Sequence, residues 1–168
     1  MTSINLIHAA LSILLLSSTA AWSHGKADSN NSDKAPRTVH ETGFGTAGDP
    51  TRVTRTVRVA MSDNMRFTPA DLSVKHGETI RFVVHNEGKV MHEMVLGTKE
   101  DLAKHAKIMR MSHEMTHDKA HMLHVAPGKT GEIIWEFSQA GTVHFGCLIP
   151  GHFEAGMIGK VDVKESAP

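Results

Sequence analysis

Between residues 53 and 163 the sequence repeats one pattern: short runs alternate polar with apolar residues, and turn-forming residues follow each run. Residues 56–61 form one such run, and the turn pair Asp63-Asn64 follows it. The further runs cover residues 72–75, 79–85, 92–96, 131–137, 141–145 and 157–163. Short strands with turn signals about every ten residues predict an all-β protein with a β-sandwich. In this arrangement Cys147 follows the penultimate strand.

The strand pattern is interrupted between residues 98 and 127. Thr98, followed by the acidic pair Glu100 and Asp101, has the composition of a helix start, and apolar residues then recur at helical spacing. We therefore expect a short helical insert in the sandwich, with a continuation rich in methionine and histidine. If that continuation is helical, one face of it carries His113, His117, His121 and His124.

The insert contains the residue types that bind copper ions. Its candidates for a secondary, labile copper site are Met109, Met111, His113, Met115, His117, His121, Met122 and His124. The alternative is structural: a face lined by methionine packs on the sandwich while the histidines point to solvent. The density of both residue types favours the copper site.

The loop between the last two predicted strands contains Cys147, His152 and Met157 at C-x4-H-x4-M spacing, with Gly and Pro residues that force the chain to turn. Taken singly, such residues are most often core or surface residues. Together, a thiolate, an imidazole and a thioether suit a soft metal that changes oxidation state. A second imidazole, for which His92 is the candidate, would complete the set that favours type 1 copper. Zinc is disfavoured because methionine is a poor zinc ligand.

Composition favours a metal-binding role and gives no indication of a nucleic-acid partner. The chain has 13 His and 10 Met residues, and its 18 basic residues balance 18 acidic ones, so no overall field attracts nucleic acid. Its single cysteine cannot form an internal disulfide. In an oxidising compartment a bound metal would protect that thiol.

The N-terminal residues indicate export. An apolar run at residues 6–16 precedes small residues, as in a cleavable signal, whereas a membrane anchor needs about 18 or more apolar residues. We expect a signal peptide over residues 1–23, a flexible polar lead-in and Gly-rich loop over 24–52, and the domain over 53–168. This organisation predicts a periplasmic protein without stable membrane insertion after cleavage.

The G-x-G-x-x-G match at 43–48 is no dinucleotide site, because no strand precedes it and a proline follows.

Three segments resemble the cupredoxin family of small blue-copper proteins: His92-Glu93-Met94-Val95, the Cys147-x4-His152-x4-Met157 loop and the closing strand at 159–163. The resemblance covers about residues 53–165 and implies a Greek-key β-sandwich. It also implies copper ligation by His92, Cys147, His152 and Met157, with Met157 weak and axial. The insert and the signal peptide together resemble the periplasmic copper-tolerance members of this family.

Glu93 departs from the family pattern. In many relatives Asn or Ser follows the first histidine ligand and bridges to the cysteine loop. The family pattern therefore does not assign this bridge to Glu93, and Asn86 is the candidate for a substitute bridge.

Four protein ligands would leave copper no open position for a substrate. Gly146 and Leu148 flank Cys147, where related copper enzymes have a histidine that passes electrons to a catalytic copper. We therefore expect no conventional catalysis, with oxidation of cuprous ions bound at the insert as the candidate activity. Two functions stay open: a periplasmic copper-tolerance protein that binds or oxidises copper, and a soluble one-electron carrier between periplasmic redox partners. The spare ligands of the insert favour the first.

Overall fold

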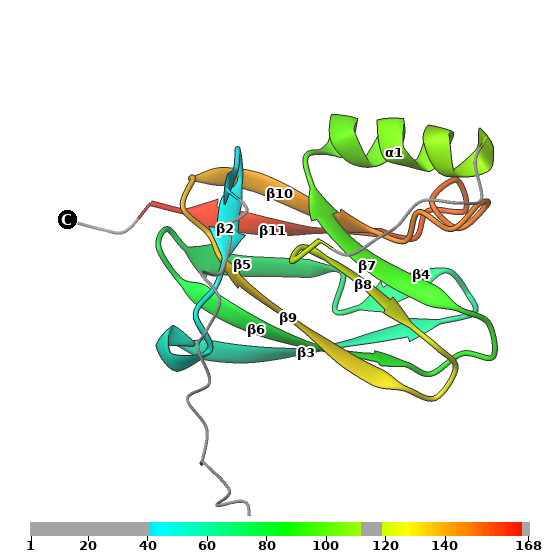
Figure 1. Ribbon diagram of the computed structural model, residues 1–168, viewed down its shortest axis with the longest axis horizontal. Helices are drawn as coiled ribbons and strands as arrows, with labels where there is room; N and C mark the ends of the chain where they lie inside the picture. The colour runs from blue at the N-terminus through cyan, green and yellow to red at the C-terminus, as the bar shows by residue number, and fades with distance from the viewer. Residues whose placement is uncertain (1–40, 112–118, 166–168) are drawn as a thin grey trace, which may run out of the picture. The chain divides into compact units, whose positions relative to one another are not determined.

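The computed structural model describes residues 41–111 and 119–165 of the chain. Two β-sheets face each other, and an α-helix lies alongside them (Figure 1). The strands are Glu41–Thr42 (β1), Gly45–Ala47 (β2), Arg55–Ser62 (β3), Arg66–Thr68 (β4), Asp71–Lys75 (β5), Thr79–Asn86 (β6), His92–Gly97 (β7), Met122–Val125 (β8), Thr130–Glu136 (β9), Gly141–Gly146 (β10) and Ile158–Lys164 (β11). The helices are the 3₁₀ turn Pro50–Arg52 (η1) and Lys99–Met111 (α1).

The first sheet has the strand order β1-β2-β9-β6-β3-β4, and the second has the order β5-β11-β10-β7-β8. Two pairings are parallel, β3 with β6 and β5 with β11, because the chain crosses between the sheets before it returns. The predicted all-β sandwich with one short helix is confirmed.

Large apolar side chains fill the space between the sheets. On β6 the alternate residues Ile80, Phe82 and Val84 are fully buried, while the residue that follows each of them is half-buried. Trp135 on β9 and Phe145 on β10 are also fully buried, so both sheets contribute to one core. Burial of each such side chain contributes about 1.5–3 kcal/mol to stability. The packed frame therefore holds the strand ends, and the loops attached to them, in fixed positions.

Pairing between β7 and β10 determines where the candidate metal-binding residues lie. Val95 on β7 stands opposite Gly146 at the end of β10. Because the two strands are antiparallel, the start of β7 and the end of β10 meet at the same end of the second sheet. The sheet register thus brings His92 near Cys147 although more than fifty residues separate them in the sequence.

The Gly-rich segment before residue 53 belongs to the first sheet. Strand β2 pairs with β9, and Gly45 has a φ of 145° there. A Cβ atom at Gly45 would lie 2.2 Å from the carbonyl oxygen of Glu136 and 2.5 Å from Nε1 of Trp135. Only glycine permits this close approach, so part of the expected flexible lead-in is instead a short hairpin that packs on the core.

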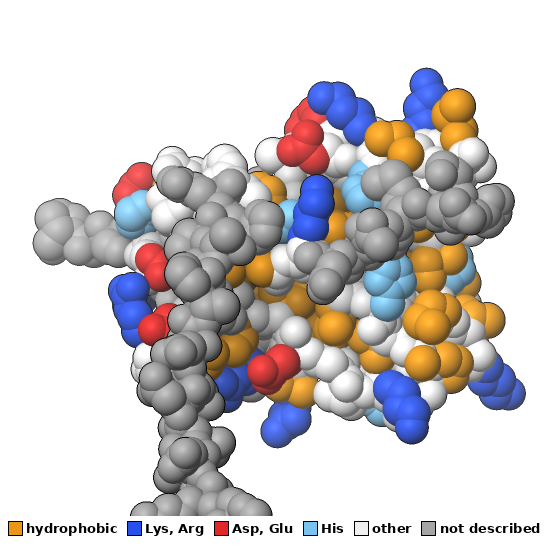
Figure 2. Space-filling model, viewed as in Figure 1, with side chains coloured by type: hydrophobic (Ala, Val, Ile, Leu, Met, Phe, Trp, Pro, Cys, Tyr) orange, Lys and Arg blue, Asp and Glu red, His pale blue; other side chains and the backbone are white. Residues whose placement is uncertain are grey.

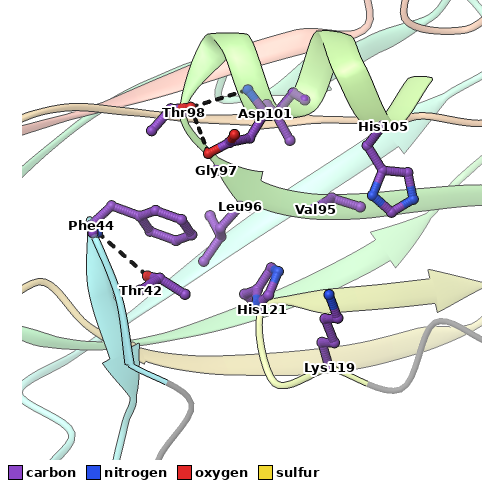
Figure 3. A pocket seen from close by; sticks show the side chains of 12 residues that line it. Thr42, Phe44, Val95, Leu96, Gly97, Thr98, Asp101, His105, Lys119 and His121 are labelled. Atoms are coloured by element: carbon purple, nitrogen blue, oxygen red, sulfur yellow. Dashed lines mark hydrogen bonds between the residues drawn. The ribbon is translucent and has the colours of Figure 1, made fainter. Parts of the chain in front are cut away.

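Helix α1 begins with the cap that its sequence predicts. The Thr98 hydroxyl accepts a hydrogen bond from the Asp101 amide at 3.1 Å and donates one to the Asp101 carboxylate at 2.8 Å (Figure 3). The helix buries Leu102 and Ala106 in a small cluster that also contains Leu148 of the cysteine loop. The helical insert therefore packs directly against the loop.

The last part of the expected helical insert is a strand. Residues Met122–Val125 form β8, which pairs with β7 and supplies hydrogen-bond partners to that strand's backbone. His121 lies in the turn before β8, so His121 and His124 do not share a helical face with the earlier histidines. The helical continuation that would align these histidines is therefore not formed at residues 121–125. Figure 2 shows hydrophobic and histidine side chains together on the face where β7 and β8 lie.

Candidate metal centre

His92 is the first residue of β7, and its side chain is fully buried. Its Nδ1 atom faces the Sγ atom of Cys147 at 3.9 Å. Its Nε2 atom lies 3.1 Å from Oδ1 of Asp63, and the other carboxylate oxygen of Asp63 accepts a hydrogen bond from the Lys89 amide at 2.8 Å. That amide bond is the main reason why the pKa of Asp63 lies below its usual value. The ionised carboxylate orients the imidazole so that Nδ1 is available to a metal.

Cys147 follows the last residue of β10 and is fully buried. Its Sγ atom accepts a hydrogen bond from the Glu93 amide at 3.4 Å and lies 3.2 Å from Nδ1 of His152. The candidate ligand atoms of His92, Cys147 and His152 all lie within 4.8 Å of one another. In the described part of the chain, this is the group of three His, Cys, Asp or Glu side chains that could hold a metal ion.

Backbone hydrogen bonds close the loop between Cys147 and Met157. The Cys147 amide donates to the Met157 carbonyl at 3.1 Å, and the Met157 amide donates to the His152 carbonyl at 3.0 Å. Gly151 and Gly156 have φ angles of 91° and 87°, which favour glycine and allow these tight turns. Met157 is fully buried at the end of this loop. With the C-x4-H-x4-M spacing, the loop therefore closes so that Met157 at its end lies next to Cys147 at its start.

Electrostatics at the site favour a bound cation. Burial raises the pKa of the Cys147 thiol to about 12, although the Glu93 amide partly opposes this shift. Burial also lowers the pKa of His152, and the nearby His92 adds to that effect. A neutral imidazole is a ready metal ligand, whereas a buried thiolate needs a compensating positive charge. Two imidazole nitrogens around a buried sulfur fit a soft metal such as copper.

Glu93 itself bridges to the cysteine loop, although the family pattern has Asn or Ser at this position. Its Oε1 atom accepts a hydrogen bond from the Leu148 amide at 2.7 Å, and its Oε2 atom lies 2.7 Å from Nε2 of His124. Asn86, the expected substitute, instead donates to the carbonyls of Val90 and Val125, each at 2.8 Å. The prediction for Asn86 is wrong because its amide closes the loop before β7 and does not reach the cysteine loop.

The secondary copper candidates lie in different surroundings. Met109 is half-buried, Met111 is 79% exposed and Met122 is buried under the helix. His121 lines a pocket beside His105 of α1, which was not among the candidates (Figure 3). His124 contacts Glu93. The candidates His113, Met115 and His117 lie outside the described residues.

A second contact joins the insert to the cysteine loop. Arg110, in the last turn of α1, forms an ion pair with Glu154 of the loop. Phe153 of the same loop packs against the cluster that Leu102 anchors. The helix therefore covers one side of the candidate centre.

Within the residues described, no helix is both long and apolar enough to cross a membrane.

Sequence comparison identifies related proteins. Residues 53–164 match the family described as copper binding proteins, plastocyanin/azurin family. A protein of Rubrivivax gelatinosus named copper-resistant cuproprotein CopI is 52% identical over 124 residues, which cover 74% of this chain and 75% of the relative. A protein of the same name in Pseudomonas aeruginosa is 34% identical over 155 residues, which cover 75% of this chain and 85% of that relative.

Solved structures share the fold. Dithionite-reduced auracyanin from Roseiflexus castenholzii is 23% identical, with a TM-score of 0.57, and the match covers 69% of this chain and 99% of auracyanin. Auracyanin B is 22% identical, also with a TM-score of 0.57, and the match covers 73% of this chain and 95% of auracyanin B. The family match spans strand β7, which begins with His92, and the loop after β10, which carries Cys147 and His152. The chain belongs to the plastocyanin/azurin family of copper-binding proteins.

Proposed function

We propose that His92, Cys147 and His152, with Met157 as a weaker ligand, would hold one copper ion as a type 1 site, and that the protein serves copper tolerance. The observation that carries this proposal is the convergence of two imidazole nitrogens and a buried sulfur within 4.8 Å. A thiolate with two imidazoles and a weak thioether is the donor set that favours type 1 copper. Copper bound by such a set supplies one-electron chemistry between Cu(I) and Cu(II).

The protein's own residues determine how such a site behaves. Asp63 and the Glu93 amide hold His92 and the Cys147 sulfur in place through hydrogen bonds of 3.1 and 3.4 Å. Full burial of His92, Cys147 and Met157 excludes water, while His152 is only half-buried and forms the route to solvent. A rigid, dry site of this kind limits the rearrangement that accompanies electron transfer and leaves no position for a substrate.

The proposed role in copper tolerance draws on two observations. Both relatives compared above are named copper-resistant cuproproteins, and their similarity extends over about three quarters of this chain. The insert adds methionine and histidine that a simple electron carrier does not need, including Met111 with its largely exposed side chain. We propose that the insert captures labile copper, and that the core site binds copper or takes one electron from a cuprous ion and passes it to a periplasmic redox partner.

The proposed location is the periplasm, reached through cleavage of a signal peptide over residues 1–23. The sequence supports it with the apolar run and small residues described above. A periplasmic redox or copper-handling protein is then the proposed partner.

A second candidate function is electron transfer between periplasmic redox partners. Val90 and Met91, directly before His92, are 45% and 44% exposed. Exposed apolar side chains beside a buried redox site suit a transient docking contact. In this alternative the insert is incidental.

Copper tolerance of cells that depend on this protein distinguishes the two functions. One variant replaces the eight candidates of the insert, with leucine for methionine and glutamine for histidine, and keeps the four core residues. A matched control is His76→Gln, since His76 is an exposed histidine whose ring contacts the Ser138 carbonyl, outside both regions. Unchanged tolerance in the insert variant would contradict the copper-tolerance proposal. Lost tolerance with an intact thiolate-to-copper absorption band would contradict the carrier proposal.

A further inference from the structure

We propose that Glu93 and His124 form a positioning pair that fixes the cysteine loop to strand β8, so that the copper site depends on the segment that ends the insert. This inference rests on the proposed ligand set. It gives His124 a role in holding the core site, in place of the secondary copper ligation expected from the sequence.

Glu93 holds the cysteine from two sides. Its backbone amide donates to the Cys147 sulfur at 3.4 Å, and its side-chain Oε1 accepts from the amide of the next residue, Leu148, at 2.7 Å. Hydrogen bonds from a backbone amide to a carboxylate are among the stronger ones in proteins. Because Glu93 also follows His92 directly, any movement of its side chain displaces the loop relative to the first histidine.

The position of Glu93 requires a partner for its second oxygen. The side chain has no exposed area, and a buried carboxylate is strongly disfavoured unless it is hydrogen-bonded or paired. Nε2 of His124 lies 2.7 Å from Oε2 of Glu93. The antiparallel register of β7 and β8 places these residues directly opposite each other. The pair is therefore built into the sheet.

His124 connects this buried carboxylate to the insert. It lies on β8, the strand at the end of the second sheet's order, and its side chain is 35% exposed. Strand β8 begins close to the end of the insert segment, and β7 is the strand with which it pairs. A shift of β8 therefore moves His124 relative to Glu93. Because Glu93 accepts a hydrogen bond from the Leu148 amide, this shift also displaces the Cys147–Leu148 peptide. The geometry couples the insert to the core site without a shared metal ligand.

Copper-loaded variants of the full mature protein test the pair. Glu93→Gln keeps an oxygen for the Leu148 amide but replaces the oxygen that faces His124, and His124→Leu removes the partner. His124→Gln keeps an amide donor that reaches Glu93, whereas the shorter His124→Asn does not. The matched control is His76→Gln. The measurements are copper content, the absorption spectrum, the electron paramagnetic resonance spectrum and the reduction potential.

We expect every variant to bind one equivalent of copper at the core site. His124→Leu and His124→Asn should change the relative intensities of the thiolate-to-copper bands, whereas His124→Gln and His76→Gln should match the wild-type spectrum. Glu93→Gln should also change these bands, because its amide nitrogen cannot replace both carboxylate oxygens that face the Leu148 amide and Nε2 of His124. This pattern separates a positioning role from general loss of stability, which would not distinguish Gln from Asn.

Identical spectra and potentials in wild type, His124→Leu and His124→Asn would overturn the inference. If His124→Leu does not fold, the comparison of His124→Gln with His124→Asn decides, and equal spectra for these two would overturn the inference. Absence of a thiolate-to-copper band in the wild-type protein would instead overturn the proposed ligand set.

Discussion

The two regions rich in copper-binding residues differ in how the fold holds their side chains. In the core site, His92 and Cys147 are fully buried, and hydrogen bonds fix the sulfur and the imidazole. In the insert, Met111 is 79% exposed, and His121 and His124 lie in a turn and a strand and not on the helix that carries Met109. The same residue types are therefore preorganised in one region and dispersed in the other. Preorganisation supports one well-defined site, whereas dispersed donors suit weaker, exchangeable binding.

Replacing Cys147 should have the largest effect on the difference in copper binding between the core site and the insert. In Cys147→Ser the core region loses the thiolate that distinguishes its donors from those of the insert. We expect complete loss of the intense thiolate-to-copper absorption band, while any weak copper binding at the insert persists. Absorption spectroscopy with metal analysis checks this. A band of unchanged intensity would show that the sulfur is not a copper ligand.

Copper affinity of the core site should depend steeply on pH. The pKa of the Cys147 thiol is about 12, so at neutral pH copper must displace one proton from the sulfur. Burial lowers the pKa of His152, so that imidazole is already neutral at pH 7 and releases no second proton. Apparent affinity should therefore rise about tenfold per pH unit between roughly pH 7 and 9.

Competition with a chelator of known affinity, at several pH values, measures this slope. Labile binding to methionine thioethers at the insert releases no proton, so its affinity should change little over the same range. A flat profile for the core site would mean that the thiolate forms without help from the metal. The pH series therefore separates the two regions by mechanism.

Part of this contrast was predictable from the sequence. The strands and the Cys147–Met157 loop follow from local patterns of residue type and spacing, and the structure brings His92, Cys147 and His152 together as expected. The contact between Glu93 and His124 was not predictable, because it depends on the register of β7 and β8. Strand β8 forms within a segment whose composition resembles that of the helical part of the insert. Strands β1 and β2 have only two and three residues, too few to show periodicity.

Asp63 should contribute to copper affinity although it is not a candidate ligand. Asp63→Asn keeps the shape of the side chain but weakens its hold on Nε2 of His92. Loss of such an outer carboxylate typically lowers metal affinity about 10–100-fold. We expect a loss near the lower end, since Asp63 is partly exposed to solvent. Chelator competition measures the change, and Asp71→Asn, at an exposed aspartate of β5, is the matched control. Equal affinities in both variants would mean that packing alone orients His92.

The smallest effect is expected at the most exposed methionine of the insert. Met111 lies at the end of α1 and is 79% exposed, so Met111→Leu should change the free energy of unfolding by less than about 0.5 kcal/mol. The thiolate-to-copper band should stay unchanged, because that band belongs to the buried site. Copper bound beyond one equivalent should fall slightly, since one thioether among several is lost. Equilibrium dialysis with absorption spectroscopy measures both. A change in the band would show that the exposed region is not independent of the core site at this end of the helix.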